Sequence, residues 1–317
     1  MVRTRRKARI GGRAIGIDLP PDALMKVTGM RFSLGHTACR LTALAAVALL
    51  ILVQAAFASN QDEATPYLDI DAELEQLSSE DLEELLVFVA GNTLFTLYHE
   101  AGHMLVSELA LPVLAQEEDA VDNLATVSML ETDTEDMDLL LTNAMVGWFL
   151  IAEDTYENLI FYNEHDLDEQ RGYRMLCLMV GADEEVFLEL AQDLGLPDER
   201  IETCAFDYEQ ASDSWAYATD PYIRDSDTPA GKIEVVYDPA PQGLSLLEIF
   251  LKESELMEQV AEEFDTFYDL PEQVTFRAAE CGMENAFWDP NIREMTLCHE
   301  LMGGFAAIYL DVLASDQ

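Results

Sequence analysis

Residues 99–103 read His-Glu-Ala-Gly-His and lie in the apolar stretch Asn92–Leu109, which predicts a helix. On a helix, residues four positions apart lie on the same face. His99 and His103 can therefore present two imidazole nitrogens to one metal ion. Glu100 lies beside them, where it can take a proton from a metal-bound water. This HExxH spacing is typical of zinc hydrolase sites.

The alternative is a pair of core histidines that are simply hydrogen-bonded. The preceding segment Leu94–Tyr98 is apolar enough to be buried. Two histidines and a glutamate side by side are costly there unless they share a partner. Gly102 costs ~1 kcal/mol against Ala in a helix, which is tolerable where another segment must approach closely. These features favour a metal site.

A catalytic zinc needs a third protein ligand, with water in the fourth place. The predicted helix Glu117–Leu130 follows the motif and carries Glu118 and Asp122 on one face. Glu118 is a candidate ligand, and an ordinary acidic surface is an equally good interpretation from spacing alone. Asp119, about 100° round the helix from Glu118, is the alternative ligand.

The N-terminal region predicts export. A basic stretch at Met30–Arg40 is followed by the 13-residue apolar run Leu41–Val53 and by Ala56-Phe57-Ala58. The run is too short for a membrane span of ~20 residues and suits a secretory signal cleaved after Ala58. We expect residues 1–58 to be an N-terminal extension and signal peptide, with the true start at Met30. Residues 59–317 would then form a single domain that is periplasmic or secreted.

The charge excludes two classes of partner. The 317 residues carry a formal net charge of −45, and residues 59–317 keep 8 of the 17 basic and 60 of the 62 acidic residues, a net charge of −52. Nucleic acid and anionic membrane surfaces are poor partners for such a chain. We expect no stable membrane insertion after signal cleavage, and the oligomeric state is left open.

Cysteine usage agrees with an oxidising compartment. Cys177, Cys204, Cys281 and Cys298 remain after signal cleavage, an even number. Their order suggests the local pairs Cys177–Cys204 and Cys281–Cys298. A four-cysteine zinc site is the alternative, but the spacings are too long for CxxC motifs.

Hydrophobic periodicity predicts a mainly α fold with a small β component. A helix opens at Ser78 and continues through Val89, and Gly91-Asn92 is expected to break it before the motif helix. Segment 195–243 is expected to be rich in loops, with a helix over Asp207–Tyr217. The other predicted helices are Met137–Glu153, Asp168–Val180, Glu184–Leu194, Leu244–Phe267 and Asn291–Leu313, and the predicted strands are Lys232–Tyr237 and Gln273–Arg277.

Several stretches together resemble the bacterial DUF4344 family of predicted metallopeptidases. They are His99–His103, Leu111–Leu114, Glu117–Asp122, Glu164–Arg171, Cys177–Gly181, Asn285–Trp288 and Thr296–Met302. The resemblance runs from about residue 70 to the C-terminus and implies a single-domain, zincin-like metallopeptidase fold. An aromatic residue is expected where this chain has His299, so the resemblance gives His299 no role.

The Glu118-x-x-x-Asp122 spacing also resembles the second helix of gluzincins. That resemblance implies that Glu118 is the third zinc ligand and that Asp122 supports a histidine ligand. His165 is a candidate for stabilising the oxyanion, as gluzincins place a His or Tyr opposite the base, and a helix-entry residue paired with an acid is the alternative. Arg171 fits a structural ion pair better than a substrate clamp.

The sequence therefore predicts an exported zinc metallopeptidase that hydrolyses peptide or protein substrates. His99, His103 and Glu118 would hold zinc, and Glu100 would be the general base for a zinc-activated water. One alternative is a non-catalytic, exported binding or envelope-associated module that retains the fold. A second is a zinc hydrolase of non-peptide amides.

Export predicts that the mature protein begins at Ser59. N-terminal sequencing of the protein recovered from its native compartment measures this directly. Finding residues 1–58 still attached would show that the segment is an uncleaved anchor or no signal at all.

Overall fold

The computed structural model describes residues 5–10, 13–18, 69–114, 116–155, 159–162, 164–225 and 230–315. The proposed signal segment, its cleavage site and Met30 lie outside these residues. The chain is mainly helical with a small four-stranded sheet, which confirms the predicted fold class. Among the described residues, no helix is both long and apolar enough to cross a bilayer.

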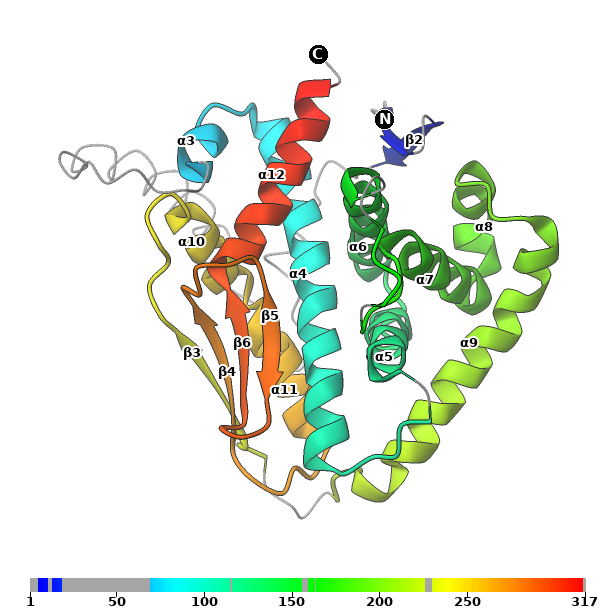
Figure 1. Cartoon of the computed structure of the whole chain (residues 1–317), viewed down its shortest axis with the longest axis vertical. Helices are drawn as coiled ribbons and strands as arrows, with labels where there is room; N and C mark the ends of the chain where they lie inside the picture. Colours follow the sequence, from blue (N-terminus) through cyan, green and yellow to red (C-terminus); the bar gives the residue numbers. More distant parts are fainter. Residues whose placement is uncertain are drawn as a thin grey trace, which may run out of the picture.

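The molecule is organised around one long helix, α4 (Ser79–Glu108), which carries the His-Glu-Ala-Gly-His motif. The Ser78 side chain accepts a hydrogen bond from the backbone N–H of Asp81 and so caps the helix. Buried residues occur on every side of α4 from Leu85 to Leu105. A helix that is apolar all round must be covered on all sides, and Figure 1 shows α4 running between the helices α5–α9 and the sheet.

The predicted break at Gly91-Asn92 is wrong, because both residues serve the packing of α4 against α6. A Cβ atom on Gly91 would lie 2.3 Å from the backbone oxygen of Leu140. The Asn92 amide donates hydrogen bonds to the backbone oxygens of Phe88 and Asn143. The glycine therefore permits a close helix contact, and the asparagine is satisfied inside the core.

In the described part of the chain, five helices lie on one side of α4, and α5 and α6 are the ones that pack against it (Figure 1). The five are α5 (Glu117–Glu131), α6 (Glu135–Thr155), α7 (Asp168–Ala182), α8 (Glu184–Asp193) and α9 (Asp198–Thr219), followed by a 3-10 turn at Asp220–Tyr222. Segment 195–243, expected to be rich in loops, holds the whole of α9. The Cys177–Cys204 disulfide joins α7 to α9.

The sheet lies on the other side, with strand order β3-β4-β6-β5 (Figure 1). Its strands are β3 (Ile233–Tyr237), β4 (Val274–Ala279), β5 (Ala286–Asp289) and β6 (Glu294–Cys298). β3, β4 and β6 are parallel, whereas β5 is an antiparallel edge strand with Trp288 opposite Met295. β5 packs along α4.

The remaining elements are the short α3 (Ile70–Leu74), three helices and an N-terminal hairpin. The helices are α10 (Ser245–Ser254), α11 (Leu256–Phe267) and α12 (His299–Ser315), and the hairpin pairs β1 (Arg5–Ile10) with β2 (Arg13–Asp18). Glu255, with φ 57°, interrupts the single helix predicted over Leu244–Phe267. The helix predicted from Asn291 begins only at His299, because the preceding residues form β6. The second disulfide joins Cys281 to Cys298, and both pairs are those expected from the order of the cysteines.

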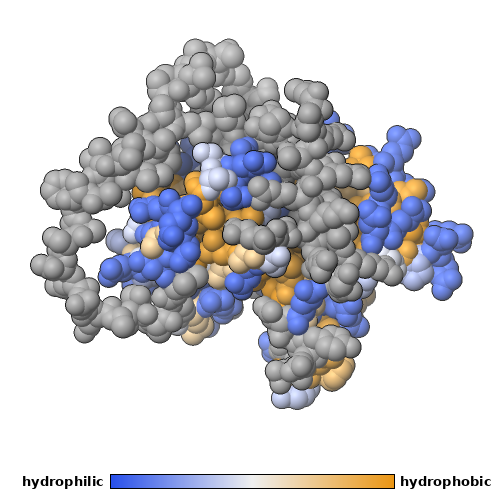
Figure 2. All heavy atoms as spheres, turned by 90° about the horizontal axis from the view of Figure 1, so that it is seen from above, coloured by the Kyte–Doolittle hydropathy of each residue, from blue (hydrophilic) through white to orange (hydrophobic). Residues whose placement is uncertain are grey.

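On the coloured part of the face seen in Figure 2, the projecting side chains are mostly hydrophilic, as the acidic composition leads one to expect.

One acidic group, Asp138 on α6, lies where its ionised form is unfavourable. Burial raises the pKa of Asp138 to about 6, and the nearby carboxylates of Asp183, Asp133 and Glu135 act in the same direction. Ionised Asp138 therefore opposes folding at neutral pH.

Replacing Asp138 by asparagine should stabilise the protein at pH 7. The folded-state pKa lies above the ordinary 3.8, so the folded state loses stability as pH rises through this interval. Discounted for solvent screening, Asp138→Asn should raise the free energy of unfolding by about 1 kcal/mol at pH 7 and by almost nothing near pH 4. Urea denaturation at both pH values measures this, with Glu185→Gln on the exposed face of α8 as the control. An equal gain at both pH values would refute the electrostatic cause.

Candidate metal centre

Two imidazoles of α4 converge on one point. His99 and His103 lie one turn apart, and their Nε2 atoms are 3.3 Å from each other. Their side chains are only 7% and 16% exposed, so the pair sits largely out of water. The i, i+4 spacing on one helix places the two rings on the same face and so brings them together.

Glu118, in the first turn of α5, supplies an oxygen at the same point. Its Oε2 atom lies 3.2 Å from His99 Nε2 and 3.4 Å from His103 Nε2. This oxygen is buried, and imidazole nitrogens surround it at 2.8–3.4 Å. A buried carboxylate oxygen that converges with two imidazole nitrogens on one point is an arrangement that a bound cation would complete.

The close approach of α5 to α4 depends on Gly102. A Cβ atom there would lie 2.8 Å from the Cβ and Cγ1 atoms of Val121, and 3.2 Å from Leu124. Any larger residue in place of Gly102 would push α5 outward and carry Glu118 away from the histidines.

These three donor atoms fit zinc. Zinc binds imidazole nitrogen and carboxylate oxygen at ~2.0–2.2 Å with tetrahedral geometry, and the donors at its corners are then about 3.3–3.5 Å apart. The observed separations among His99 Nε2, His103 Nε2 and Glu118 Oε2 are 3.2–3.4 Å. The three atoms therefore have the spacing of one face of such a tetrahedron.

The Nδ1 atoms of both histidines are held by carboxylates. His99 Nδ1 lies 2.8 Å from Asp122 Oδ1, and His103 Nδ1 lies 2.8 Å from Glu117 Oε1. Each carboxylate accepts the Nδ1 proton, which fixes the ring and leaves Nε2 facing the candidate metal position. The role of Glu117 was not predicted from the sequence, although its place one residue before Glu118 was a usable signal.

Arg171 on α7 lies behind Asp122. Its Nε and Nη2 atoms each donate to one oxygen of the Asp122 carboxylate at 2.8 Å, and its guanidinium stacks 3.6 Å from the centre of the Trp148 ring. Arg171 therefore forms the ion pair for which it was a candidate, and this pair supports His99 through Asp122.

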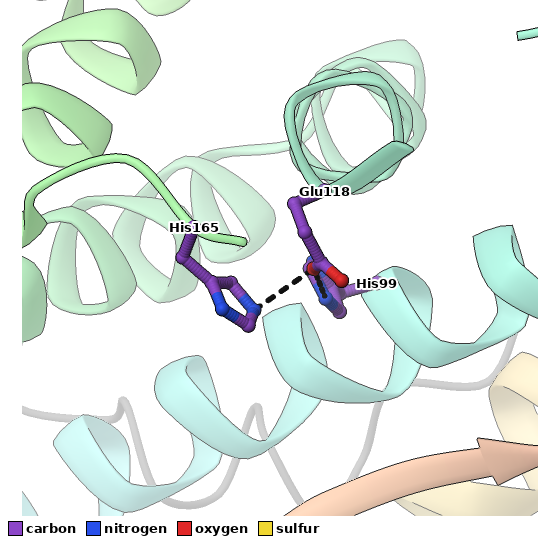
Figure 3. A group of neighbouring side chains, drawn as sticks. All are labelled: His99, Glu118 and His165. Atoms are coloured by element: carbon purple, nitrogen blue, oxygen red, sulfur yellow. Dashed lines mark ion pairs between the residues drawn. The ribbon is translucent and has the colours of Figure 1, made fainter. Parts of the chain in front are cut away.

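His165 approaches from the segment before α7. Its Nε2 atom lies 2.8 Å from Glu118 Oε2, and its ring stacks on that of His99 at 6.2 Å between centres. Figure 3 shows His165 and Glu118 lying side by side above α4 and pointing toward one another, and the His165 side chain is 37% exposed. The three residues His99, Glu118 and His165 form a group whose ligand atoms all lie within 4.8 Å of one another.

Glu100 is buried beside the histidines. Burial raises the pKa of its carboxyl group, an effect that the neighbouring His99 and His103 and a hydrogen bond from the backbone N–H of Trp288 oppose. The carboxylate therefore faces β5, the edge strand next to α4. A raised pKa suits a group that must accept a proton and give it up again.

The carboxylates also control the charge of the histidines. Burial lowers the pKa of His99, but its bonds to Asp122 and Glu118 outweigh this and raise the pKa to about 9. The pKa of His103 is raised against burial by Glu118 and Glu117. Those of Glu118 and Asp122 are held well below the usual range, where the three nearby histidines and Arg171, respectively, overcome burial. In the metal-free protein the site is thus a cluster of paired ions.

Two other candidates lie elsewhere. Asp119, the alternative ligand, directs its carboxylate to Arg174, 2.6 Å away, and makes no contact with the histidine pair. His299 Nε2 donates a hydrogen bond to the backbone oxygen of Asp238 at 2.9 Å. It takes no part in the cluster.

The chain belongs to the DUF4344 family, described as "Putative metallopeptidase", whose model matches residues 58–218 and 238–316. This confirms the resemblance predicted from the sequence, and membership implies a metal and a peptide or protein substrate. No curated protein and no solved structure is significantly similar to the chain.

The Arg171–Asp122 pair should be strongly coupled in stability. Either Arg171→Met or Asp122→Ala leaves a buried charge without its main partner, so each should lower the free energy of unfolding by about 3 kcal/mol. The double variant removes both charges and should lose clearly less than the sum. Urea denaturation of the four proteins measures the coupling, and simple additivity would contradict the buried ion pair.

Proposed function

We propose that this protein is an exported, zinc-dependent peptidase. His99, His103 and Glu118 hold the ion, Glu100 is the general base, and His165 stabilises negative charge that develops on the substrate carbonyl oxygen. The observation that carries this proposal is the buried oxygen of Glu118, which lies at tetrahedral spacing from two imidazole nitrogens.

When bound, zinc lowers the pKa of a water molecule toward ~7 and polarises the scissile carbonyl. The protein supplies the proton transfers. Glu100 takes a proton from the attacking water and delivers it to the leaving amine, which its buried position and raised pKa favour. A purely structural metal site has no need of a buried carboxylate at this position.

His165 supports the catalytic assignment by its position. It is the most exposed of the three histidines around Glu118, and its Nε2 atom is within 2.8 Å of the ligand oxygen. A donor at this place can reach a carbonyl oxygen bound next to the metal ligands.

The substrate would lie along β5. This strand forms one edge of the sheet and packs against the motif helix, and the backbone of Trp288 faces Glu100. An extended peptide can add to an edge strand through main-chain hydrogen bonds, which places its backbone beside the general base.

Export is supported by the two disulfides, which form and persist in oxidising compartments. The same location agrees with the leader expected in the sequence. A metal site assembled in that compartment would acquire its ion after the chain has crossed the membrane.

The proposal predicts that metal binding and hydrolysis can be separated. Glu100→Gln keeps the side-chain shape and all three ligands, so zinc should remain near one equivalent while hydrolysis falls roughly 10²–10⁴-fold. Glu118→Ala should instead weaken zinc binding itself, because two imidazoles alone hold the ion poorly. Metal analysis and cleavage of a labelled, denatured protein measure both properties.

Glu185→Gln is the matched control, since it removes one exposed acid of α8. It should keep both zinc and activity. Zinc without hydrolysis in the unaltered protein would favour the non-catalytic binding module. Full zinc retention in a His99→Ala, His103→Ala double variant would end the metal assignment.

A further inference from the structure

Two arginines of α7 form ion pairs with two aspartates of α5. Arg171 and Arg174 lie one turn apart on α7, and their partners Asp122 and Asp119 lie one turn apart on α5. The Arg171–Asp122 pair supports the candidate ligand His99 through Asp122. The Arg174–Asp119 pair has no part in the function proposed above.

Arg174 bridges two segments of the chain. Its Nη1 atom donates to Asp119 Oδ1 at 2.6 Å, and its Nη2 atom donates to Asp166. Asp119 directly follows Glu118, and Asp166 directly follows His165. One guanidinium therefore joins the two residues that flank the His165–Glu118 contact.

The bridge joins surfaces that would otherwise repel each other. The first turn of α5 and the segment around His165 are both acidic, with Glu117, Glu118 and Asp119 on the helix and Glu164, Asp166, Asp168 and Glu169 on the segment. The negative charges of the two segments repel each other when the segments come into contact, and a cation bound between them offsets this repulsion. The side chains of the bridge are about one quarter exposed, 24–28%, so the charges are only partly screened.

We propose that Arg174 is a positioning residue that docks the His165 segment onto α5 and so sets His165 against Glu118. Its consequence for turnover rests on the proposed function, whereas docking itself does not. Arginine suits this task because its planar guanidinium holds two carboxylates at once, which the point charge of lysine does less well.

Docking is measured on the metal-free protein by acylation of histidine with diethyl pyrocarbonate, mapped by mass spectrometry. In the unaltered protein, His165 Nε2 is held against Glu118 and should react slowly. A minor conformation of a protein is typically populated at ~0.1–10%. If loss of the Arg174 bridge makes the undocked conformation the dominant one, acylation of His165 in Arg174→Ala should be about tenfold faster or more. Arg174→Lys should lie between the two.

The matched control is Arg200→Ala. Arg200 pairs with Asp207 on α9, so its loss changes the net charge equally but away from the site. It should leave the acylation of His165 unchanged. If Arg174→Ala does not fold, Asp166→Asn breaks only the half of the bridge that holds the segment, and it should also speed acylation. Unchanged acylation of His165 in folded Arg174→Ala or Asp166→Asn overturns the proposal.

The consequence for catalysis is measured by a double-mutant cycle. Arg174→Ala and His165→Ala should each lower kcat with little change in KM, and the double variant should be no slower than His165→Ala alone. Effects that multiply would show that Arg174 does not act through His165. An unaltered protein without zinc or hydrolysis would defeat the proposed function, yet the acylation result would still decide whether Arg174 docks the segment.

Discussion

The close contact between α4 and α5 is the constraint on which the site depends. Gly102 lets Val121 come within a distance that no other residue would permit. This contact brings Glu118 to both histidines, and it brings Asp122 and Glu117 to their Nδ1 atoms. The cost of burying so many charges is offset because each has a partner of opposite sign. The candidate site is therefore formed by the α4–α5 interface, and a change in the packing of these helices would also change the geometry of the site.

The sequence predicted what depends on local spacing. The histidine pair follows from helix periodicity, which also places Glu118 and Asp122 on one face of the next helix. The roles expected for these two acids came from the resemblance to gluzincins, because spacing alone left Glu118 open. The arginines of α7 reach α5 from about 50 positions away, and nothing local indicates which acid each arginine meets. The break at Glu255 was missed because a left-handed residue there is not glycine. β6 was missed because its short apolar run after Pro290 looks like the start of a helix.

Scarcity of cations gives each one a structural role. All eight lysines and arginines after residue 68 contact a carboxylate or a backbone oxygen. Two of them, Arg171 and Arg174, lie on consecutive turns of α7 and pair with acids of α5 beside the candidate metal site. In a chain with so many acids, electrostatic repulsion is screened by salt across the surface, but it must be removed by specific pairing wherever two acidic segments meet. The distribution of arginine thus marks the contacts that the fold cannot leave to solvent.

The three candidate ligands all belong to one helical hairpin, α4 and α5. Contacts between segments so near in sequence form quickly, because little chain entropy is lost in closing the short loop between them. The hairpin can therefore gather its donor atoms before the sheet and α7 are in place. A metal ion bound by the hairpin at that stage would act as a folding nucleus. The later packing of α7 would then fix the geometry of the metal-bound hairpin.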